Sequence, residues 1–152
     1  MVIERAKLSD IEELYSLQLL AFESEAEMIG SRSVPALMES FEQARDDFSQ
    51  WSVLKAVENG AIIGAVRYRK QGEVVEIGRL MVHPNYRRQG LGKRLISEVE
   101  LRCNGEILEL YSCTKSFTNI RLYEKCGFRA IKEELGADGL SFVYMRKNDV
   151  DK

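Results

Sequence analysis

The chain has 152 residues, of which 45% are hydrophobic and 30% charged, and its formal net charge is −2 at pH 7. This length and composition predict one soluble globular domain and exclude a disordered or fibrous protein. Because acidic and basic residues are interspersed, no domain-wide positive field exists, and neither nucleic acid nor an anionic membrane is an expected partner.

Segments for export, membrane crossing and metal binding are not expected. The N-terminus lacks the apolar stretch of a signal peptide, and no run approaches the roughly 18 apolar residues that cross a bilayer, so we expect a cytoplasmic protein. The three cysteines, Cys103, Cys113 and Cys126, lack metal-ligand spacing. We therefore predict reduced, structural thiols and no metal. The one histidine, His83 before Pro84, is interpreted as a solvated turn residue rather than the partner of a nucleophilic cysteine.

The N-terminal third predicts a strand and two helices. Ser9 and Glu12 have the spacing of a capping box, and Pro35 is tolerated in the first turn of a helix. Apolar residues recur at helical spacing in both helices. The expected elements are a strand over residues 2–6, a helix over 9–22, a loop over 23–33 and a helix over 33–48.

After residue 50 the spacing of apolar residues changes from that of helices to that of strands. Asn59-Gly60 is the strongest hairpin signal in the chain, and Gln71-Gly72 marks a second turn. A later buried strand follows a helix-bearing crossover, which implies a parallel neighbour in a mixed sheet. The expected elements are antiparallel strands over 51–58, 61–69 and 74–82, a helix over 91–103, a strand over 107–111, a helix over 116–126, and a closing hairpin of strands over 128–134 and 140–146.

The run Arg87-Arg88-Gln89-Gly90-Leu91-Gly92-Lys93 lies between an expected strand and an expected helix, and it predicts an anion site. Glycines leave the backbone open to a ligand, and the first amides of a helix have no carbonyl partner. Each hydrogen bond to a charged oxygen contributes about 1.5–3 kcal/mol, against about 0.3–1 kcal/mol for the helix dipole, so amide geometry dominates. The Walker and dinucleotide patterns do not fit. The alternative is a tight turn that only begins a helix.

Two segments resemble the GNAT (GCN5-related) N-acetyltransferase superfamily. The strand end Leu80-Met81-Val82-His83-Pro84 and the run Tyr86–Gly92 resemble its acyl-CoA loop, and Asn119–Phe128 is similar to its late helix. The order of the expected elements is also that of the GNAT fold. The resemblance implies a single N-acetyltransferase domain over residues 1–152 of the α/β (α+β) class, with a mixed, mostly antiparallel central sheet of about seven strands flanked by about four helices.

The resemblance further implies an acyltransferase that moves an acetyl group from acetyl-CoA, its co-substrate, to a primary amine. Direct attack in a ternary complex is favoured because the chain offers no activated nucleophile. Asn119 would contact the coenzyme and Tyr123 would face its thiol, and a spacing of four residues puts both on one helical face. The implied coenzyme-binding residues are Leu80, Met81, Val82, Arg87, Arg88, Gln89, Gly90, Leu91, Gly92, Lys93, Asn119, Tyr123 and Lys125.

The expected catalytic residues are Tyr123 and Glu76. By resemblance, Tyr123 is the acid for the departing thiolate, and an amide near Met81 or Val82 is the oxyanion donor. Glu76 is the expected base, directly or through water, and we expect its side chain on the same strand face as those of Leu80 and Val82. Tyr123 could instead be a core aromatic residue, and Glu76 a strand carboxylate opposite Arg67 or Arg69.

One residue of the loop departs from the family pattern. Gln89 stands where the family usually has a small residue, and it would weaken coenzyme binding if it pointed inward.

The identity of the acceptor is left open by the sequence. The acceptor pocket is expected between residues 22–48 and residues 136–142. Four glutamates there hint at a cationic acceptor or form a solvated face: Glu23, Glu25, Glu27 and Glu39. A small amine, an amino acid, an antibiotic, a protein N-terminus and a lysine are all compatible.

Two other functions compete with the acetyltransferase. One is a non-catalytic acyl-CoA-binding or sensing module, in which Glu76 and Tyr123 are structural. The other is a nucleic-acid-binding module that uses the basic residues around the loop, which the acidic net charge disfavours. The acyl-chain preference and the oligomeric state, including a homodimer, are left open by the sequence.

Overall fold

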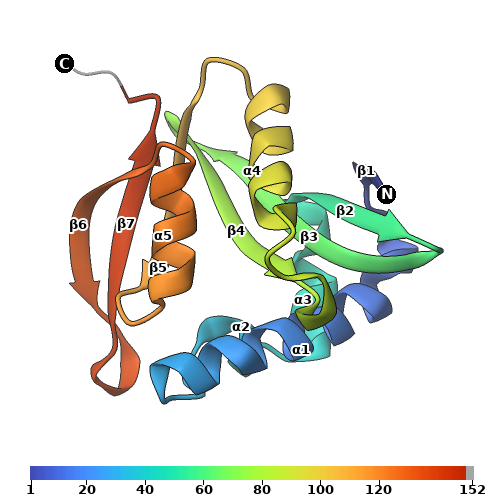
Figure 1. The fold of residues 1–152 in the computed structure, drawn as a ribbon, viewed down its shortest axis with the longest axis horizontal. Coiled ribbons are helices and arrows are strands. Elements are labelled where there is room, and N and C mark those ends of the chain that lie inside the picture. The colour runs from blue at the N-terminus through green and yellow to red at the C-terminus, as the bar shows by residue number, and fades with distance from the viewer. Residues whose placement is uncertain (150–152) are drawn as a thin grey trace.

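The computed structural model describes residues 1–149, so residues 150–152 of the predicted domain lie outside the described part. One mixed sheet has the strand order β1-β2-β3-β4-β5-β7-β6. The predicted fold class is confirmed (Figure 1). The elements are β1 (Val2–Arg5), α1 (Ile11–Ile29), α2 (Pro35–Met38), α3 (Phe41–Asp47), β2 (Ser52–Glu58), β3 (Ala61–Gln71), β4 (Val74–Val82), α4 (Leu91–Arg102), β5 (Ile107–Cys113), α5 (Phe117–Lys125), β6 (Arg129–Leu135) and β7 (Ser141–Lys147).

The pairing of the strands follows the predicted turns. Strands β1 to β4 are successive antiparallel neighbours. The turn between β2 and β3 has positive φ at both Asn59 (53°) and Gly60 (80°), as a type I′ hairpin requires. The expected parallel neighbour of β5 is β4, with Val74–Glu76 beside residues 107–109.

An irregularity in β4 opens the sheet in its middle. Ala65 of β3 pairs with Met81 and Arg67 with Gly78, so three steps along β4 match two along β3. The extra residue is a β-bulge, with Arg79 at φ 47°. Strand β4 pairs with β5 only over its first three residues. Figure 1 shows the two strands diverging beyond this point, with α1 crossing below the opening.

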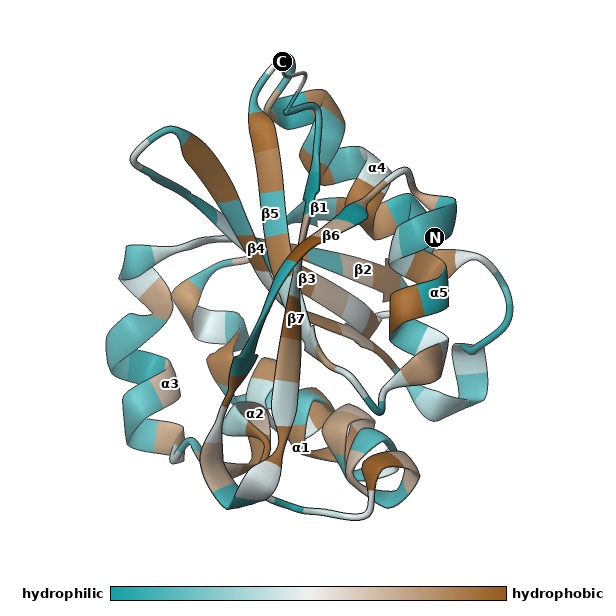
Figure 2. Ribbon diagram, turned by 90° about the vertical axis from the view of Figure 1, so that its left-hand side faces the viewer, coloured by the Kyte–Doolittle hydropathy of each residue, from teal (hydrophilic) through white to brown (hydrophobic). Residues whose placement is uncertain are grey.

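The two faces of the sheet carry separate hydrophobic cores. On one face α4 and α5 pack against the sheet, and α4 contributes its apolar stripe of Leu91, Leu95, Ile96 and Val99. On the other face α1 packs through Leu14, Leu17 and Ala21 against residues that include Trp51 and Met81. Figure 2 shows α4 and α5 on the side of the sheet away from α3.

The start of the first helix differs from the prediction. The amide of Lys7 donates to Asp10 Oδ2 at 2.8 Å, and a 3-10 turn over Leu8–Asp10 precedes α1. The predicted Ser9–Glu12 capping box is therefore wrong. Asp10 also pairs with Lys55 Nζ at 3.0 Å, so a contact with β2 fixes the helix start, and local spacing could not reveal it.

The loop predicted over residues 23–33 is mostly helix. Helix α1 continues to Ile29 and ends at Gly30, which has φ 77°. Ala26 and Ile29 are buried and extend the apolar stripe. Glu27, the polar residue between them, is exposed, so it does not interrupt the helix.

The second predicted helix is divided into α2 and α3. Glu39 is extended (ψ 131°), and Ser40 begins α3 with a capping box. Its Oγ accepts from the amide of Gln43 at 3.1 Å, and its own amide donates to Gln43 Oε1 at 2.8 Å. This local cap favours a new helix start over continuation.

Candidate active site

The loop between β4 and α4 has the backbone geometry of an anion site. Gly90 is the N-cap of α4 in the left-handed region, at φ 80°. The amide of Arg94 donates to the carbonyl of Gly90 at 3.0 Å, so the amides from Gly90 to Lys93 precede the first helical bond. Arg88, Gln89 and Lys93 are exposed around them. Free N–H groups and positive charge therefore meet at one helix end.

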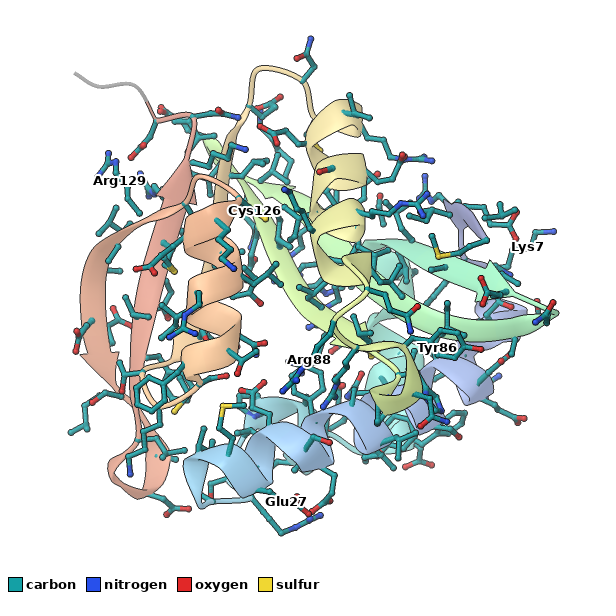
Figure 3. The ribbon with its side chains drawn as sticks, viewed as in Figure 1. Lys7, Glu27, Tyr86, Arg88, Cys126 and Arg129 are labelled. Carbon is teal, nitrogen blue, oxygen red and sulfur yellow. The ribbon has the colours of Figure 1, made fainter. Side chains whose placement is uncertain are left out.

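Gly92 makes a close approach between α4 and α5. A Cβ atom on Gly92 would lie 3.0 Å from Leu122 Cδ2 and 3.8 Å from Leu80 Cδ2. Burial raises the pKa of the Cys126 thiol, against the opposing charges of Lys147 and Lys93. Figure 3 shows Arg88 on the side of the loop that faces α5, and Tyr86 on the opposite side. The start of α4, the candidate anion site, thus lies next to α5.

The other residues predicted to bind coenzyme have varied surroundings. Arg87 donates to the carbonyls of Ala21 at 3.2 Å and Val82 at 3.3 Å, so this guanidinium ties α1 to the end of β4. Leu80 and Val82 pack against the core beside α4, whereas the side chain of Met81 is buried in the core beside α1. Lys125 is exposed at the end of α5.

A cleft brings both predicted catalytic residues together. It encloses about 740 Å³, counting the part that opens to solvent, and lies where β4 and β5 diverge. Glu76, Leu80, Asn119 and Tyr123 all line it. Both segments predicted for an acceptor pocket contribute, with Phe22, Glu25, Val34, Pro35 and Ala36 from the first and Phe142 from the second.

Tyr123 is buried in this cleft, with 7% of its surface exposed. Its ring packs edge-on against Phe128, with 6.2 Å between centroids. Burial, and then the nearby Glu25 carboxylate, raise the pKa of the phenol well above its ordinary value of 10.0. The hydroxyl therefore stays protonated throughout the neutral range and can act as a donor.

Asn119 is held by the carboxylate of Glu25, one of the four glutamates expected near the acceptor pocket, in a contact that was not predicted. Its Nδ2 donates to Glu25 Oε1 at 2.9 Å, which joins α5 to α1 across the opening in the sheet. Burial raises the pKa of Glu25 above its ordinary value of 4.5, against the opposing effects of the Asn119 hydrogen bond and the charge of Arg87. No local pattern signals this contact, because the partners are 94 positions apart.

We expect Glu25→Gln to stabilise the protein relative to wild type as pH rises. The folded-state pKa of Glu25 is raised, so its contribution to stability is complete below pH 4.5 and is lost as pH rises through the folded pKa. A glutamine oxygen can still accept from Asn119. Thermal unfolding from pH 4 to 8 should show the Tm difference growing over this window. Glu23→Gln is the control, because Glu23 pairs with Arg32 at the surface; a flat difference for Glu25→Gln would contradict the expectation.

Glu76 lies in the cleft but on the other face of β4 from the one expected. Val75 and Ile77 share a core with Leu80 and Val82, so Glu76 faces the α1 side. The bulge at Arg79 reverses the alternation of side chains between the two faces of β4. The prediction that Glu76 lies on the same face as Leu80 and Val82 is therefore wrong. Glu76 Oε1 pairs with Arg69 Nε at 3.2 Å, as the alternative interpretation expected.

The sequence did not single out three further residues of the cleft: Trp51, Arg67 and Arg79. Both guanidiniums lie near the Trp51 side of the cleft, and their Nε atoms are buried without a hydrogen-bond partner among residues 1–149. Of the four acidic residues expected near the pocket, Glu23 pairs with Arg32, Glu27 is exposed, and Glu25 and Glu39 reach the interior.

The remaining reactive groups have structural surroundings. All three cysteines are free, and burial raises the pKa of Cys103 and of Cys126. His83 Nδ1 accepts from the amide of Asn85 at 3.1 Å, which caps a short turn. Within residues 1–149 no His, Cys, Asp and Glu side chains cluster as a metal site would need. No helix in the same range is long and apolar enough to span a membrane.

Known proteins resemble this chain in sequence and in fold. YqkA of Bacillus subtilis, described as a UPF0157 protein, is 29% identical over 129 residues; the match covers 84% of this chain but only 37% of YqkA. The Escherichia coli ribosomal-protein-S18-alanine N-acetyltransferase has 20% identity and a TM-score of 0.74, over 96% of this chain and 92% of its own. YncA of Salmonella typhimurium, solved with acetyl-CoA, has 19% identity and a TM-score of 0.73, over 100% and 96%.

A family-level match also covers most of the chain. The family described as "Acetyltransferase (GNAT) domain" matches residues 16–148, which include the loop, the cleft and the helix that carries Asn119 and Tyr123. The chain therefore belongs to the GNAT family of acetyltransferases.

Proposed function

We propose that this protein transfers an acetyl group from acetyl-CoA to a primary amine by direct attack in a ternary complex. The observation that carries the proposal is the placement of two proposed catalytic groups in one cleft between β4 and β5, with the start of α4 beside it, where a Cβ on Gly92 would lie 3.8 Å from Leu80 of the cleft. The two groups are the buried phenol of Tyr123 and the carboxylate of Glu76. The related YncA structure holds acetyl-CoA, which supports this co-substrate.

The start of α4 fits the diphosphate of the coenzyme. The amides from Gly90 to Lys93 offer donors, and Arg88 and Lys93 add charge. Gln89 is exposed, which fits an outward side chain. Arg87 would act by holding the loop against α1, since it already donates to two carbonyls. Leu80 and Val82 would contact the acyl arm through the open edge of β4, and Met81 only through its backbone.

The chemistry then needs two proton transfers and a place for negative charge. The amine nitrogen attacks the thioester carbon, so a C–N bond forms and the C–S bond breaks. An amide of β4 near Met81, beyond the last pairing with β5, would stabilise the oxyanion. Tyr123 would donate its proton to the departing thiolate, and Glu76 would take the ammonium proton through water.

The proposal is tested by measuring thiol release from acetyl-CoA across a panel of amines, with mass spectrometry of the products. Turnover with an acetylated amine product would support the enzyme. The hydrogen bonds of Glu76 to Arg69 and of Asn119 to Glu25 favour the alternative of a non-catalytic acyl-CoA-binding module. Tight coenzyme binding without turnover of any amine would establish that alternative.

Glu76→Gln tests the assignment of the base. We expect kcat/KM at pH 7 to fall about 100-fold. The loss of kcat/KM relative to wild type should shrink as pH approaches the pKa of the amine, about 8 for an α-amine and 10 for an alkylamine, because the free amine needs no base.

A neighbouring glutamate supplies the control for this variant. Glu109 lies beside Glu76 in parallel register and pairs with Arg146 at 2.7 Å, outside the residues that line the cleft. Glu109→Gln should keep the wild-type pH profile. A small, pH-independent loss in Glu76→Gln would mean that Glu76 serves only as the partner of Arg69.

A further inference from the structure

One wall of the cleft holds a guanidinium with no hydrogen-bonded counter-ion among residues 1–149. Arg67 and Arg79 line this wall, and Arg69 lies next to them over the Trp51 ring. Two of the three have carboxylate partners: Arg69 pairs with Glu76 at 3.2 Å and Arg79 with Glu39 at 3.6 Å. Arg67 has no hydrogen bond or ion pair to any other residue within 1–149, and its Nε is buried without an acceptor. Glu39 is already shared, because it also accepts from Gln18 Nε2 at 2.9 Å.

The guanidinium of Arg67 is held in place by its neighbours. Its central carbon lies 3.9 Å from the centroid of the Trp51 ring. It also crosses over Gly78, where an added Cβ would come within 3.6 Å of Arg67 Nε. Stacking on an aromatic ring leaves the N–H groups at the edge of a guanidinium free to donate. The side chain is therefore positioned for a ligand rather than free to turn toward solvent.

The electrostatic surroundings favour an anion at this position. Burial, and then the charge of Arg79, lower the pKa of Arg67 to about 10, against the attraction of Glu39, Asp47 and Tyr111. Arg67 thus remains a cation at neutral pH, but it is partly desolvated and next to a like charge. A desolvated cation without a hydrogen-bonded counter-ion is unfavourable, so a carboxylate that binds here would supply the counter-ion that Arg67 lacks among residues 1–149.

Arg67 also lies at a suitable distance from Glu76, the proposed base. It pairs with Gly78 in register, and Gly78 lies two residues from Glu76 on the same face of β4. Two residues along a strand span about 7 Å. An anionic group at Arg67 would therefore leave an amine a few bonds away near Glu76, in the cleft that Tyr123 also lines.

We propose that the acceptor is an amine that carries a carboxylate, and that Arg67 binds this carboxylate and sets the acceptor specificity. The inference rests on the proposed acetyltransferase function. It replaces the cationic acceptor that the four glutamates suggested, because Glu23 and Glu39 are paired with arginines and Glu27 is exposed. The carboxylate could belong to a free amino acid or to an acidic residue at the start of a peptide.

Matched substrates test the proposal. One arm compares free α-, β- and γ-amino acids with their carboxamides, and the other compares peptides that begin with Asp or Glu with those that begin with Asn or Gln. In one of the two arms we expect kcat/KM to favour the acid about 10- to 100-fold over its amide. That arm identifies the source of the carboxylate.

Variants of Arg67 link the preference to this residue. Arg67→Gln should raise KM for the acid, abolish its preference over the amide and leave KM for acetyl-CoA unchanged. Arg67→Lys should restore part of the preference, since it keeps the charge but not the planar fork. Arg102→Gln is the control, because Arg102 pairs with Glu98 at the end of α4, away from the cleft. Unchanged coenzyme affinity shows that each variant has folded.

A binding readout separates failure of this proposal from failure of the proposed function. Trp51 is the only tryptophan and contacts Arg67 and Arg69, so its fluorescence should change when the preferred acid, but not its amide, binds to protein loaded with coenzyme A. Turnover of acids and amides at equal rates, with no effect of Arg67→Gln, would overturn the acceptor proposal alone. If no amine is turned over, the enzyme proposal fails. An acid-specific fluorescence change would then still support an anion site at Arg67, and its absence would overturn that site as well.

Discussion

Tyr123→Phe is expected to lower kcat about 100- to 10,000-fold, the range that a positioned general acid contributes. The phenol is buried at the cleft, and its raised pKa keeps the proton on the oxygen at neutral pH, where the proposed donation to the thiolate requires it. Phenylalanine keeps the ring and its contact with Phe128, so the fold and coenzyme affinity should change little. Steady-state kinetics with saturating acetyl-CoA, together with calorimetric titration of coenzyme A, would measure both quantities.

A second tyrosine supplies the control. Tyr144 also has a raised pKa, mainly from burial, but it contacts Lys132 on β6 and lies outside the residues that line the cleft. Tyr144→Phe should therefore retain the wild-type kcat. If Tyr123→Phe were as active as Tyr144→Phe, the phenol would be a core aromatic group and the leaving thiolate would be protonated by water or another residue.

The second large effect is expected at the start of α4. Gly90→Val should weaken binding of coenzyme A about 10- to 100-fold, because each hydrogen bond between an amide and a charged oxygen contributes about 1.5–3 kcal/mol. Gly90 has φ 80°, and a β-branched residue strongly disfavours that conformation. The loop would shift and take the amides of Gly90 to Lys93 out of position. Isothermal calorimetry would measure the loss.

Gly105→Val provides a closely matched comparison. Gly105 has φ 84°, and an added Cβ at either glycine would meet nothing within 4 Å, so both substitutions carry a similar conformational cost. Gly105 follows α4, at the opposite end of the helix from the loop. Both variants should be less stable, but only Gly90→Val should bind coenzyme A poorly. Equal affinities would place the diphosphate elsewhere.

Features set by neighbouring residues were predictable from the sequence. Asn59 and Gly60 favour the positive φ angles that a tight hairpin needs, and Gly127 ends α5 at φ 99° as expected. The glycines of the loop and the four-residue spacing of Asn119 and Tyr123 also depend on local geometry. The loop could therefore be predicted from its own residues, whereas the roles expected for Asn119 and Tyr123 came from the resemblance of the late helix to the GNAT family.

Features set by distant residues were not predictable. Nothing about Arg79 signals a positive φ, because that conformation is unfavourable for arginine and is stabilised here by the surrounding sheet. The bulge reversed the predicted facing of Glu76. The contacts of Asn119 with Glu25, of Arg87 with Ala21 and of Arg67 with Trp51 join segments at least 16 positions apart. Such pairings require the folded sheet before they can be recognised.

Under the proposed function, the bulge at Arg79 would let one strand contact acetyl-CoA with one face and the acceptor with the other. Before it, Glu76 and Gly78 look toward α1 and the unpaired guanidinium; after it, Leu80 and Val82 look toward α4 and α5. Mutations on one side of residue 79 can therefore remodel one wall while sparing the other. The wall proposed to bind the acceptor can therefore change during evolution while the wall proposed to contact acetyl-CoA is retained.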